Sequence, residues 1–338
     1  MLTGERVLTL RAPGRLHLGF LDPAATLGRR FGSLGLVIEG FETVVELTAS
    51  PSDRVSALTA AAQAEVERAS AHLYALRERS GLHAPLHLRL LEVLPAHAGF
   101  GSGTQLALAV GRAFAQWHGL NVSTAMLASW LGRGLRSGVG IAGFDQGGLL
   151  LDGGPGADGA PAPLLARIAL PEAWRIVIVC DPEHRGLSGD QERQAIGSLP
   201  ALPRAQAADI CHQMLMRVLP GAASAEFEPF AAGISHVQRV LGAHFAPAQG
   251  GSAYTSPRVG ALVRWLCEAS RAEQGAATGQ SSWGPTGFAI LPSQALAEAL
   301  VARARTAGVV DPALSLHIVR ARNHGAVLGE QAANAAGR

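Results

Sequence analysis

The segment LPAHAGFGSGTQLALAV, from Leu94 to Val110, is the most informative stretch of this chain. An alternating strand pattern at 86–93 precedes it, and an apolar helix pattern over 103–118 follows it and stops at Gly119. Glycine lets a backbone turn tightly and approach a ligand closely. The first turn of a helix presents unpaired N–H groups that carry partial positive charge. Residues 95–105 are therefore predicted to bind a phosphate or a pyrophosphate.

The predicted ligands in this loop are backbone groups at three glycines, two hydroxyl side chains and one amide: Gly99, Gly101, Gly103, Ser102, Thr104 and Gln105. An alternative is a glycine-rich turn that only starts a helix. Three alternating glycines with two hydroxyl groups exceed what such a turn needs, which favours the phosphate site.

All 28 basic residues of this 338-residue chain are arginines, and lysine is absent. Pyridoxal phosphate enzymes and lysine-dependent aldolases need a lysine for their Schiff base, and a P-loop NTPase needs one on its phosphates. The sequence excludes these classes. Any bound phosphate must be met by arginine, backbone N–H groups, hydroxyl groups or a metal ion.

The remaining composition indicates a globular protein of two domains, with 48% hydrophobic and 16% charged residues. The formal net charge is +2 and the arginines are scattered, so no nucleic-acid partner is expected. No apolar run reaches the roughly 18 residues that span a bilayer, and charges interrupt the N-terminal segment. A cytoplasmic protein without membrane contact is expected. Cys180, Cys211 and Cys267 form no CxxC pair, so buried thiols are expected rather than disulfides or zinc ligands.

Strand and helix patterns alternate irregularly along the chain, which favours an α+β fold over one doubly wound sheet. The segment 7–20 is expected to form two strands joined by a Pro-Gly turn, and 34–48 is expected to form one or two more. Further strands are expected at 86–93, 147–152, 174–181, 286–291 and 315–322, and helices at 56–80, 103–118, 124–133, 203–218, 225–241, 257–272 and 293–307. The segment 153–163 has almost nothing to bury and is expected to be a loop near a domain boundary. The predicted domains are 1–165 and 166–338.

Three motifs resemble those of the GHMP kinase superfamily and occur in the same order. APGRLHLGF at 12–20 is similar to the first motif, PAHAGFGSGTQ at 95–105 to the second, and SSWGPTGFAI at 281–290 to the third. Together with FDQGGLLLDGG at 144–154 and HRGLSGDQE at 184–192, they resemble one branch, the β-ribofuranosylaminobenzene 5′-phosphate synthases. Five similar segments in order cover most of the chain.

The sequence departs from the motifs at three positions. Phe100 stands where a leucine is usual, and Asp145 stands where a glutamate is expected, which keeps the charge but shortens its reach. Gly103 replaces the second serine that is common in true kinases. The last change favours the synthase branch.

The resemblance implies a fold and an activity. The fold is a ribosomal-S5-domain-2-like N-terminal domain followed by a ferredoxin-like C-terminal domain. The activity is transfer of a phosphoribosyl group from phosphoribosyl pyrophosphate to 4-aminobenzoate, with release of CO₂ and pyrophosphate, as in methanopterin biosynthesis. Mg²⁺ is the implied cofactor, with Ser102 and Asp145 as its candidate ligands, and a homodimer is expected.

Such chemistry requires that the enzyme stabilise the departing pyrophosphate, orient the aminobenzoate and exclude water. Arg15 and His17 lie two residues apart and so on one face of a strand. With Asp145, they are the candidate catalytic residues. The alternatives are a solvated strand face for Arg15 and His17, and a turn or helix cap for Asp145. Asp152, before two glycines, is either functional or a turn residue.

Two segments of the second half are expected to bind substrate. One follows the buried strand at 174–181, since ligand residues often lie in loops at strand ends, and the other is the turn-rich stretch at 280–284. Trp283 could stack on the aminobenzoate ring, and the alternative for it is core packing. The candidates in the two segments are His184, Arg185, Ser188, Gly189, Ser281, Ser282 and Trp283.

Two other functions stay open at this point. An ATP-dependent small-molecule kinase of the same superfamily would share the fold and the loop but would consume ATP. A non-catalytic phosphosugar-binding protein would need only the loop. Since the usual phosphoribosyltransferase fingerprint is absent, the phosphoribosyl assignment rests on the resemblance.

Overall fold

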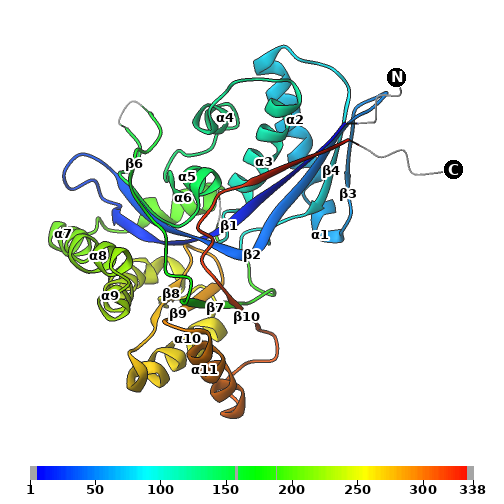
Figure 1. Ribbon diagram of the computed structural model, residues 1–338. Coiled ribbons are helices and arrows are strands. Elements are labelled where there is room, and N and C mark those ends of the chain that lie inside the picture. The colour runs from blue at the N-terminus through cyan, green and yellow to red at the C-terminus, as the bar shows by residue number, and fades with distance from the viewer. Residues whose placement is uncertain (1–5, 157–158, 188, 333–338) are drawn as a thin grey trace.

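The computed structural model describes residues 6–156, 159–187 and 189–332, and these form two β-sheets with helices packed around them (Figure 1). The larger sheet has the strand order β11-β1-β2-β4-β3, with β5 pairing with β2 and β6 pairing with β5. The smaller sheet has the order β10-β7-β9-β8. No described helix is long and apolar enough to cross a bilayer.

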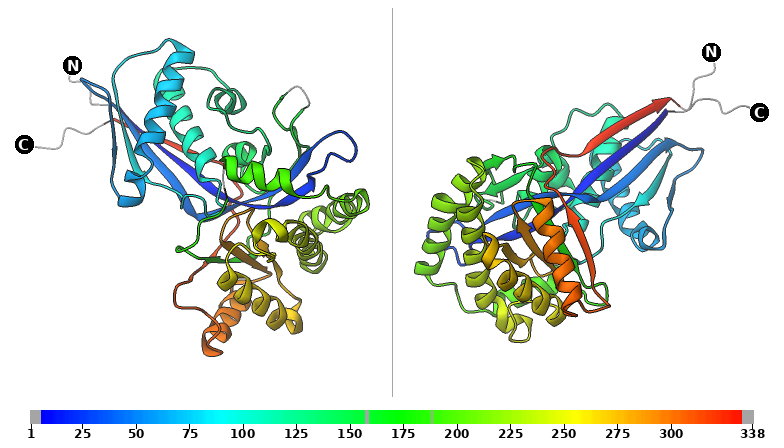
Figure 2. Two further views of the ribbon diagram at one scale, coloured as in Figure 1. Left: turned by 180° about the vertical axis from the view of Figure 1, so that it is seen from behind. Right: turned by 60° about the horizontal axis from the view of Figure 1, so that its bottom comes forward.

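A long antiparallel hairpin of β1 (Arg6–Asp22) and β2 (Phe31–Ala49) forms the centre of the larger sheet. The last described strand, β11 (Val327–Ala332), returns to pair with β1, and Figure 2 shows it lying along the N-terminal strand. The other strands of this sheet are β3 (Arg54–Ala57), β4 (Leu86–Glu92), β5 (Leu149–Asp152) and β6 (Leu164–Ile168).

Helix α3 (Ser102–Trp117) packs its apolar side against the larger sheet and positions the glycine-rich loop. Leu106, Val110 and Phe114 recur every fourth residue on one side of the helix and are buried. Burial of each such side chain stabilises the fold by roughly 1.5–3 kcal/mol. The neighbouring helices are α1 (Ala60–Gln63), α2 (Val66–Ser80), α4 (Thr124–Trp130) and α5 (Val139–Gln146).

The smaller sheet and two helices follow one another in the order β-α-β-β-α-β, which is the ferredoxin-like arrangement. The expected C-terminal fold is therefore confirmed. Helices α10 and α11 cover one face of this sheet, where Val177, Ala289 and Leu300 belong to one buried cluster. The elements are β7 (Arg175–Cys180), α10 (Pro257–Ser270), β8 (Ala277–Gln280), β9 (Thr286–Leu291), α11 (Gln294–Thr306) and β10 (Ser315–Val319).

A helical insertion between β7 and α10 packs against both sheets, and its α9 contacts β1 of the larger sheet and β8 of the smaller one (Figure 1). Its Ile234 shares one buried cluster with Leu18 of the larger sheet and Ile178 of the smaller one. This shared core joins the two sheets into one structure. The insertion contains α6 (Gly189–Ser198), α7 (Arg204–Gln213), the π-helical turn η1 (Met214–Val218), α8 (Leu219–Ala223), α9 (Phe227–Phe245) and the short turn η2 (Ala246–Gln249); a further turn, η3 (Arg271–Glu273), follows α10.

The structure differs from the sequence-based expectation at several points. The two strands expected over 7–20 are one strand, β1, because its pairing with β2 continues past a bulge between Pro13 and Arg15. The predicted boundary after residue 165 falls inside β6, and β11 from the far end of the chain completes the N-terminal sheet. The single helix expected over 56–80 is instead the end of β3 followed by α1 and α2. Alanine-rich composition favours helix throughout this stretch, but pairing with β4 draws residues 54–57 into the sheet.

Candidate active site

An open cleft of about 720 Å³ lies beside β1, the N-terminal ends of α3 and α5, and α6. Four arginines line it, and none of the described lining residues is acidic. A cleft lined by several guanidinium groups attracts an anionic ligand. The four are Arg15, Arg30, Arg133 and Arg136.

The glycine-rich loop enters α3 with free amides. Gly99 and Gly101 have φ values of 96° and 77°, which a side chain would strain. The N–H groups of Thr104 and Gln105 donate to the Gly101 carbonyl. The N–H groups of Gly101, Ser102 and Gly103 have no acceptor among the described residues. The start of α3 can therefore bind an anion through backbone donors, although of the loop residues Thr104 lines the cleft directly.

Two side chains bind the same carbonyl oxygen of this loop. Arg15 Nη1 donates to the Gly99 carbonyl at 2.8 Å, and Ser281 Oγ donates to the same oxygen at 2.7 Å. Ser281 Oγ also accepts the backbone N–H of His17 at 2.9 Å. A side chain on Gly284 would collide with the backbone of Ala98. This turn of the second sheet thus packs directly on the loop and fixes its position.

Two further arginines converge on the first turn of α3. A side-chain carbon placed on Gly103 would lie 3.4 Å from Arg133 Nη1 and 3.8 Å from Arg68 Nη1. Arg68 pairs with Glu65 at 3.0 Å. Arg133 Nη2 lies 3.5 Å from His72 Nε2, and burial with the nearby arginines lowers the pKa of His72 to about 4. Because His72 is neutral, these guanidinium groups retain a net positive charge at the space left by Gly103.

The start of α5, in contrast, is already capped. The carboxylate of Asp152 accepts the backbone N–H groups of Gly138 at 2.7 Å and Val139 at 3.1 Å. It also accepts those of Ser33 at 3.0 Å and Gly154 at 2.8 Å. Burial raises the pKa of Asp152, although these hydrogen bonds oppose the rise. Asp152 is therefore a structural residue that positions the segment carrying Arg136.

His17 is buried at the inner end of the cleft in its neutral form. Its side chain is 3% exposed, and its Nε2 atom has no hydrogen-bond partner among the described residues. Burial, together with the guanidinium groups of Arg15 and Arg136, lowers the pKa of His17 to about 3. A neutral imidazole cannot attract a phosphate by charge, but it can donate or accept a hydrogen bond.

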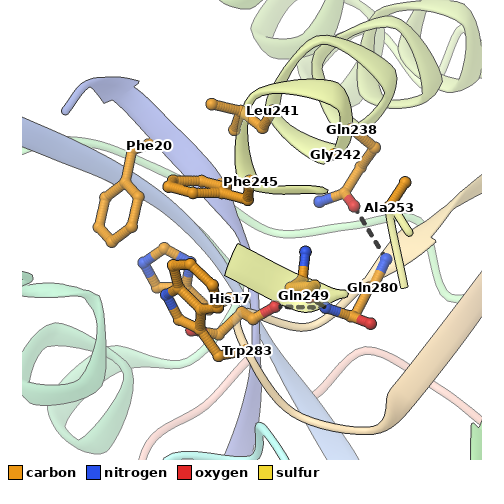
Figure 3. A pocket seen from close by; sticks show the side chains of 12 residues that line it. His17, Phe20, Gln238, Leu241, Gly242, Phe245, Gln249, Ala253, Gln280 and Trp283 are labelled. Carbon is orange, nitrogen blue, oxygen red and sulfur yellow. Dashed lines mark hydrogen bonds between the residues drawn. The ribbon is translucent and has the colours of Figure 1, made fainter. Parts of the chain in front are cut away.

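A second, smaller pocket of about 40 Å³ adjoins the cleft (Figure 3). It shares His17, Phe20 and Ser282 with the cleft. Aromatic rings stand on one side of it, and glutamine side chains stand on the other. The aromatic side includes Phe245 and Trp283, whose ring centres are 4.8 Å apart.

Comparison with known proteins agrees with this architecture. A family model of the GHMP kinase N-terminal domain matches residues 58–151. A β-ribofuranosylphenol 5′-phosphate synthase from Archaeoglobus fulgidus is 32% identical over 302 residues, which cover 86% of this chain and 89% of the relative. The chain belongs to this synthase family. A synthase of the same name from Methanothermobacter thermautotrophicus is 32% identical over 248 residues, which cover 68% of this chain and 75% of the relative.

Solved structures show the same fold at low sequence identity. Homoserine kinase from Cytophaga hutchinsonii matches with a TM-score of 0.66 at 16% identity, covering 95% of this chain and 97% of that chain. Mevalonate diphosphate decarboxylase from Staphylococcus aureus matches with a TM-score of 0.66 at 16% identity, covering 97% and 99%. The expected GHMP-type fold is confirmed, and the synthase family is one version of it.

The predicted metal ligands of this synthase-family chain do not meet in the cleft. Asp145 lies near the C-terminal end of α5, where its carboxylate accepts Thr124 Oγ1 at 2.6 Å. The start of the same helix borders the cleft, about 10 Å away at 1.5 Å rise per residue. No described group of three or more His, Cys, Asp or Glu residues could hold a metal ion. The described residues therefore do not fit a protein-held Mg²⁺ formed by Ser102 and Asp145.

The residues predicted to bind substrate lie in different places in the structure. Ser282 lines both cavities, and Trp283 lines the small pocket, where its ring packs against Phe245. Ser281 does not line either cavity, and its hydroxyl donates to the Gly99 carbonyl of the loop. His184 and Arg185 are exposed and do not line the cleft, and His184 lies 3.1 Å from the Asp181 carboxylate. Gly189 begins α6, and Ser188 lies outside the described residues.

Sequence reasoning missed the segment 132–140, which supplies Arg133, Arg136, Ser137 and Gly140 to the cleft. Its sequence, GRGLRSGVG, combines glycines with two arginines ahead of a helix. That combination is the available signal for a second anion-contacting segment. It was weaker than the 95–105 signal because no strand precedes it.

Proposed function

We propose that this chain transfers the phosphoribosyl group of phosphoribosyl pyrophosphate to a 4-substituted benzoate, with loss of CO₂ and pyrophosphate. From 4-aminobenzoate the product is β-ribofuranosylaminobenzene 5′-phosphate, an intermediate of methanopterin biosynthesis. The A. fulgidus relative is named for the corresponding phenol, so the 4-hydroxy acid is a second substrate in this proposal. The observation that carries the proposal is a cleft with four arginines, free helix N-terminal amides and no described acidic lining residue.

The substrate carries a diphosphate at one end of the ribose and a phosphate at the other. The α3 start, with the Arg133 and Arg68 guanidinium groups beside it, suits the diphosphate, because its amides lack acceptors. Arg15, Arg30 and Arg136 line the rest of the cleft and suit the second phosphate and the benzoate carboxylate. One extended anion would thus span both groups of arginines.

The reaction balances without a net proton. The bond between the anomeric carbon and the diphosphate oxygen breaks, and its electron pair leaves with pyrophosphate. The ring carbon that bears the carboxylate donates an electron pair to the anomeric carbon. The ring–carboxylate bond then breaks, its pair restores the aromatic ring, and CO₂ leaves. Fixed backbone and guanidinium donors at the diphosphate stabilise the developing charge on the leaving group.

In this proposal, Mg²⁺ is bound by the substrate rather than by the protein. Since no described acidic side chain lines the cleft, the ion would enter on the diphosphate oxygens rather than on protein carboxylates. No step above depends on it. A homodimer stays a prediction, which sedimentation equilibrium would test.

The test uses carboxyl-labelled 4-aminobenzoate and 4-hydroxybenzoate, each with phosphoribosyl pyrophosphate and Mg²⁺. We expect labelled CO₂ and an equal amount of pyrophosphate. Absence of labelled CO₂ from both acids would reject the proposal. ADP formation from ATP with a small alcohol would instead support a kinase, which normally takes the acceptor proton with a carboxylate that this cleft lining lacks.

A further inference from the structure

The two cavities that meet at His17, Phe20 and Ser282 differ in charge. Arginines line the large cleft, whereas none of the described residues that line the small pocket is charged. The polar groups of the small pocket are the Ser282 hydroxyl, the neutral His17 imidazole, and the amides of Gln238, Gln249 and Gln280. A molecule with one anionic end and one neutral polar end would bind here with its anionic end in the cleft and its neutral end in the small pocket.

The small pocket also sets a size limit. A water molecule needs roughly 10–15 Å³ of such space. At about 40 Å³, the pocket accepts a hydroxyl or amino group but not a whole benzene ring. The ring itself would remain at the mouth, beside Phe20, whose ring centre lies 4.6 Å from that of His17.

His17 supplies the unsatisfied polar group at this junction. Its main chain is fixed on both sides, because its N–H donates to Ser281 Oγ at 2.9 Å and its carbonyl accepts the Ser282 N–H at 3.1 Å. Its side-chain Nε2 is buried without a partner in the described structure. A buried polar atom without a partner is unfavourable. A ligand group that hydrogen-bonds to this atom would relieve that penalty.

We propose that the small pocket takes the 4-substituent of the aromatic acid, a hydroxyl or amino group that donates a hydrogen bond to His17. This inference rests on the proposed function and specifies the orientation of the ring. Positions 1 and 4 are at opposite ends of a benzene ring, so the carboxylate-bearing carbon then faces the arginine-lined cleft. The reverse orientation buries a carboxylate where no cation lines the wall, which is strongly unfavourable.

The orientation also suits the chemistry of the ring. When the carboxylate-bearing carbon donates electrons to the anomeric carbon, positive charge develops on the 4-substituent. A hydrogen bond from that substituent to a neutral imidazole stabilises the charge, whereas an imidazolium would oppose it. His17 therefore determines specificity for substituents that carry a proton.

The test measures equilibrium binding by calorimetry at saturating inorganic pyrophosphate, without phosphoribosyl pyrophosphate. The three ligands are 4-hydroxybenzoate, benzoate and terephthalate, which differ only at position 4. We expect 4-hydroxybenzoate to bind about tenfold more tightly than benzoate, the effect of one buried hydrogen bond. Terephthalate should bind more weakly than benzoate. Equal binding of 4-hydroxybenzoate and benzoate would overturn the inference.

Variants of His17 give a second readout. His17→Phe should remove the preference for 4-hydroxybenzoate and leave benzoate affinity within about twofold, while His17→Gln should restore part of the preference. His317→Phe makes the same change at an exposed residue of β10 and should have no effect. A preference that survives in folded His17→Phe protein, checked by thermal melting, would overturn the inference. Failure of the proposed function is distinguishable, because it is the absence of labelled CO₂ from wild-type protein.

Discussion

Helices α3 and α5 both begin at glycine-rich segments beside the cleft, yet their first turns differ. At α3, the amides of Gly101, Ser102 and Gly103 have no described acceptor. At α5, the carboxylate of Asp152 already accepts the first amides. A glycine-rich helix start is therefore an anion site only where no side chain of the same protein caps it.

The charged groups beside the two helix starts differ in the same way. Guanidinium groups of Arg15 and Arg133 stand beside the open start of α3. At the start of α5, the buried Asp152 carboxylate already accepts the backbone N–H groups, so they are not available to a ligand. The four predictions that follow test this contrast, in order of decreasing expected effect.

The closed helix start should be the more important for stability. In Asp152→Asn, an amide N–H₂ would face backbone N–H groups that now donate to a carboxylate. We expect the free energy of unfolding to fall by about 4 kcal/mol, measured by urea denaturation. Asp145→Asn is the matched control, because that exposed carboxylate accepts one hydroxyl, and its effect should stay below about 1 kcal/mol. Equal effects of the two substitutions would contradict the assignment of Asp152 as the cap.

The open helix start should be the more important for catalysis. In Gly101→Ala, the new carbon would meet Arg15 Cζ at 3.1 Å at a residue with φ of 77°. A displacement of the loop should lower kcat/KM about 100-fold in the labelled-CO₂ assay. Gly119→Ala, at the other end of α3, has a similar φ of 67° and meets nothing within 4 Å. If both variants lose activity alike, backbone strain rather than loop position explains the loss.

The arginines beside α3 should contribute affinity more than rate. Arg133→Gln removes one guanidinium group at the space left by Gly103. We expect the KM for phosphoribosyl pyrophosphate to rise about tenfold, with little change in kcat. The difference in KM between the variant and the wild-type protein should become smaller at high salt. Arg79→Gln, an exposed substitution in the last turn of α2, should leave KM unchanged. An unchanged KM in Arg133→Gln would place the diphosphate elsewhere.

The same positive charge should make stability depend on pH through His17. Its pKa is near 6.5 in the unfolded chain and about 3 in the folded protein. Below pH 6.5 the unfolded state binds a proton that the folded state does not, so stability falls as pH falls from 6.5 toward 3. Between pH 7.5 and 6, wild-type protein should lose about 1 kcal/mol more than His17→Gln. Parallel urea-denaturation curves for the two proteins would show that His17 is not neutral in the fold.

Much of the fold could be predicted because its signals are local. Gly119 ends the apolar pattern of α3, and Ser256 caps α10 by accepting the Val259 N–H, directly before Pro257. The pairing of β11 with β1 could not be predicted, because a short strand near the chain end carries no mark of its distant partner. The helix expected from residue 56 wrongly includes residues 56–57 for a similar reason, since contact with β4 decides their state.

The candidate site was predicted in part. Arg15, His17, Thr104 and Ser282 were predicted, and all four line the cleft. Asp145 was expected to hold a metal ion in the cleft, but the length of α5 places it at the far end of that helix. Ser281 was expected to bind substrate, but its hydroxyl makes hydrogen bonds to the Gly99 carbonyl and the His17 N–H.

By itself, the sequence determined the glycine-rich loop before α3, the absence of lysine, and the family to which the chain belongs. These are properties of neighbouring residues, which the periodicity and composition of a segment express directly. Only the tertiary structure decided which helix start is open and which is capped. It also decided that four arginines from three separate segments share one cleft, with a neutral pocket beside it. Such arrangements depend on contacts between residues far apart in the chain, and no local pattern records them.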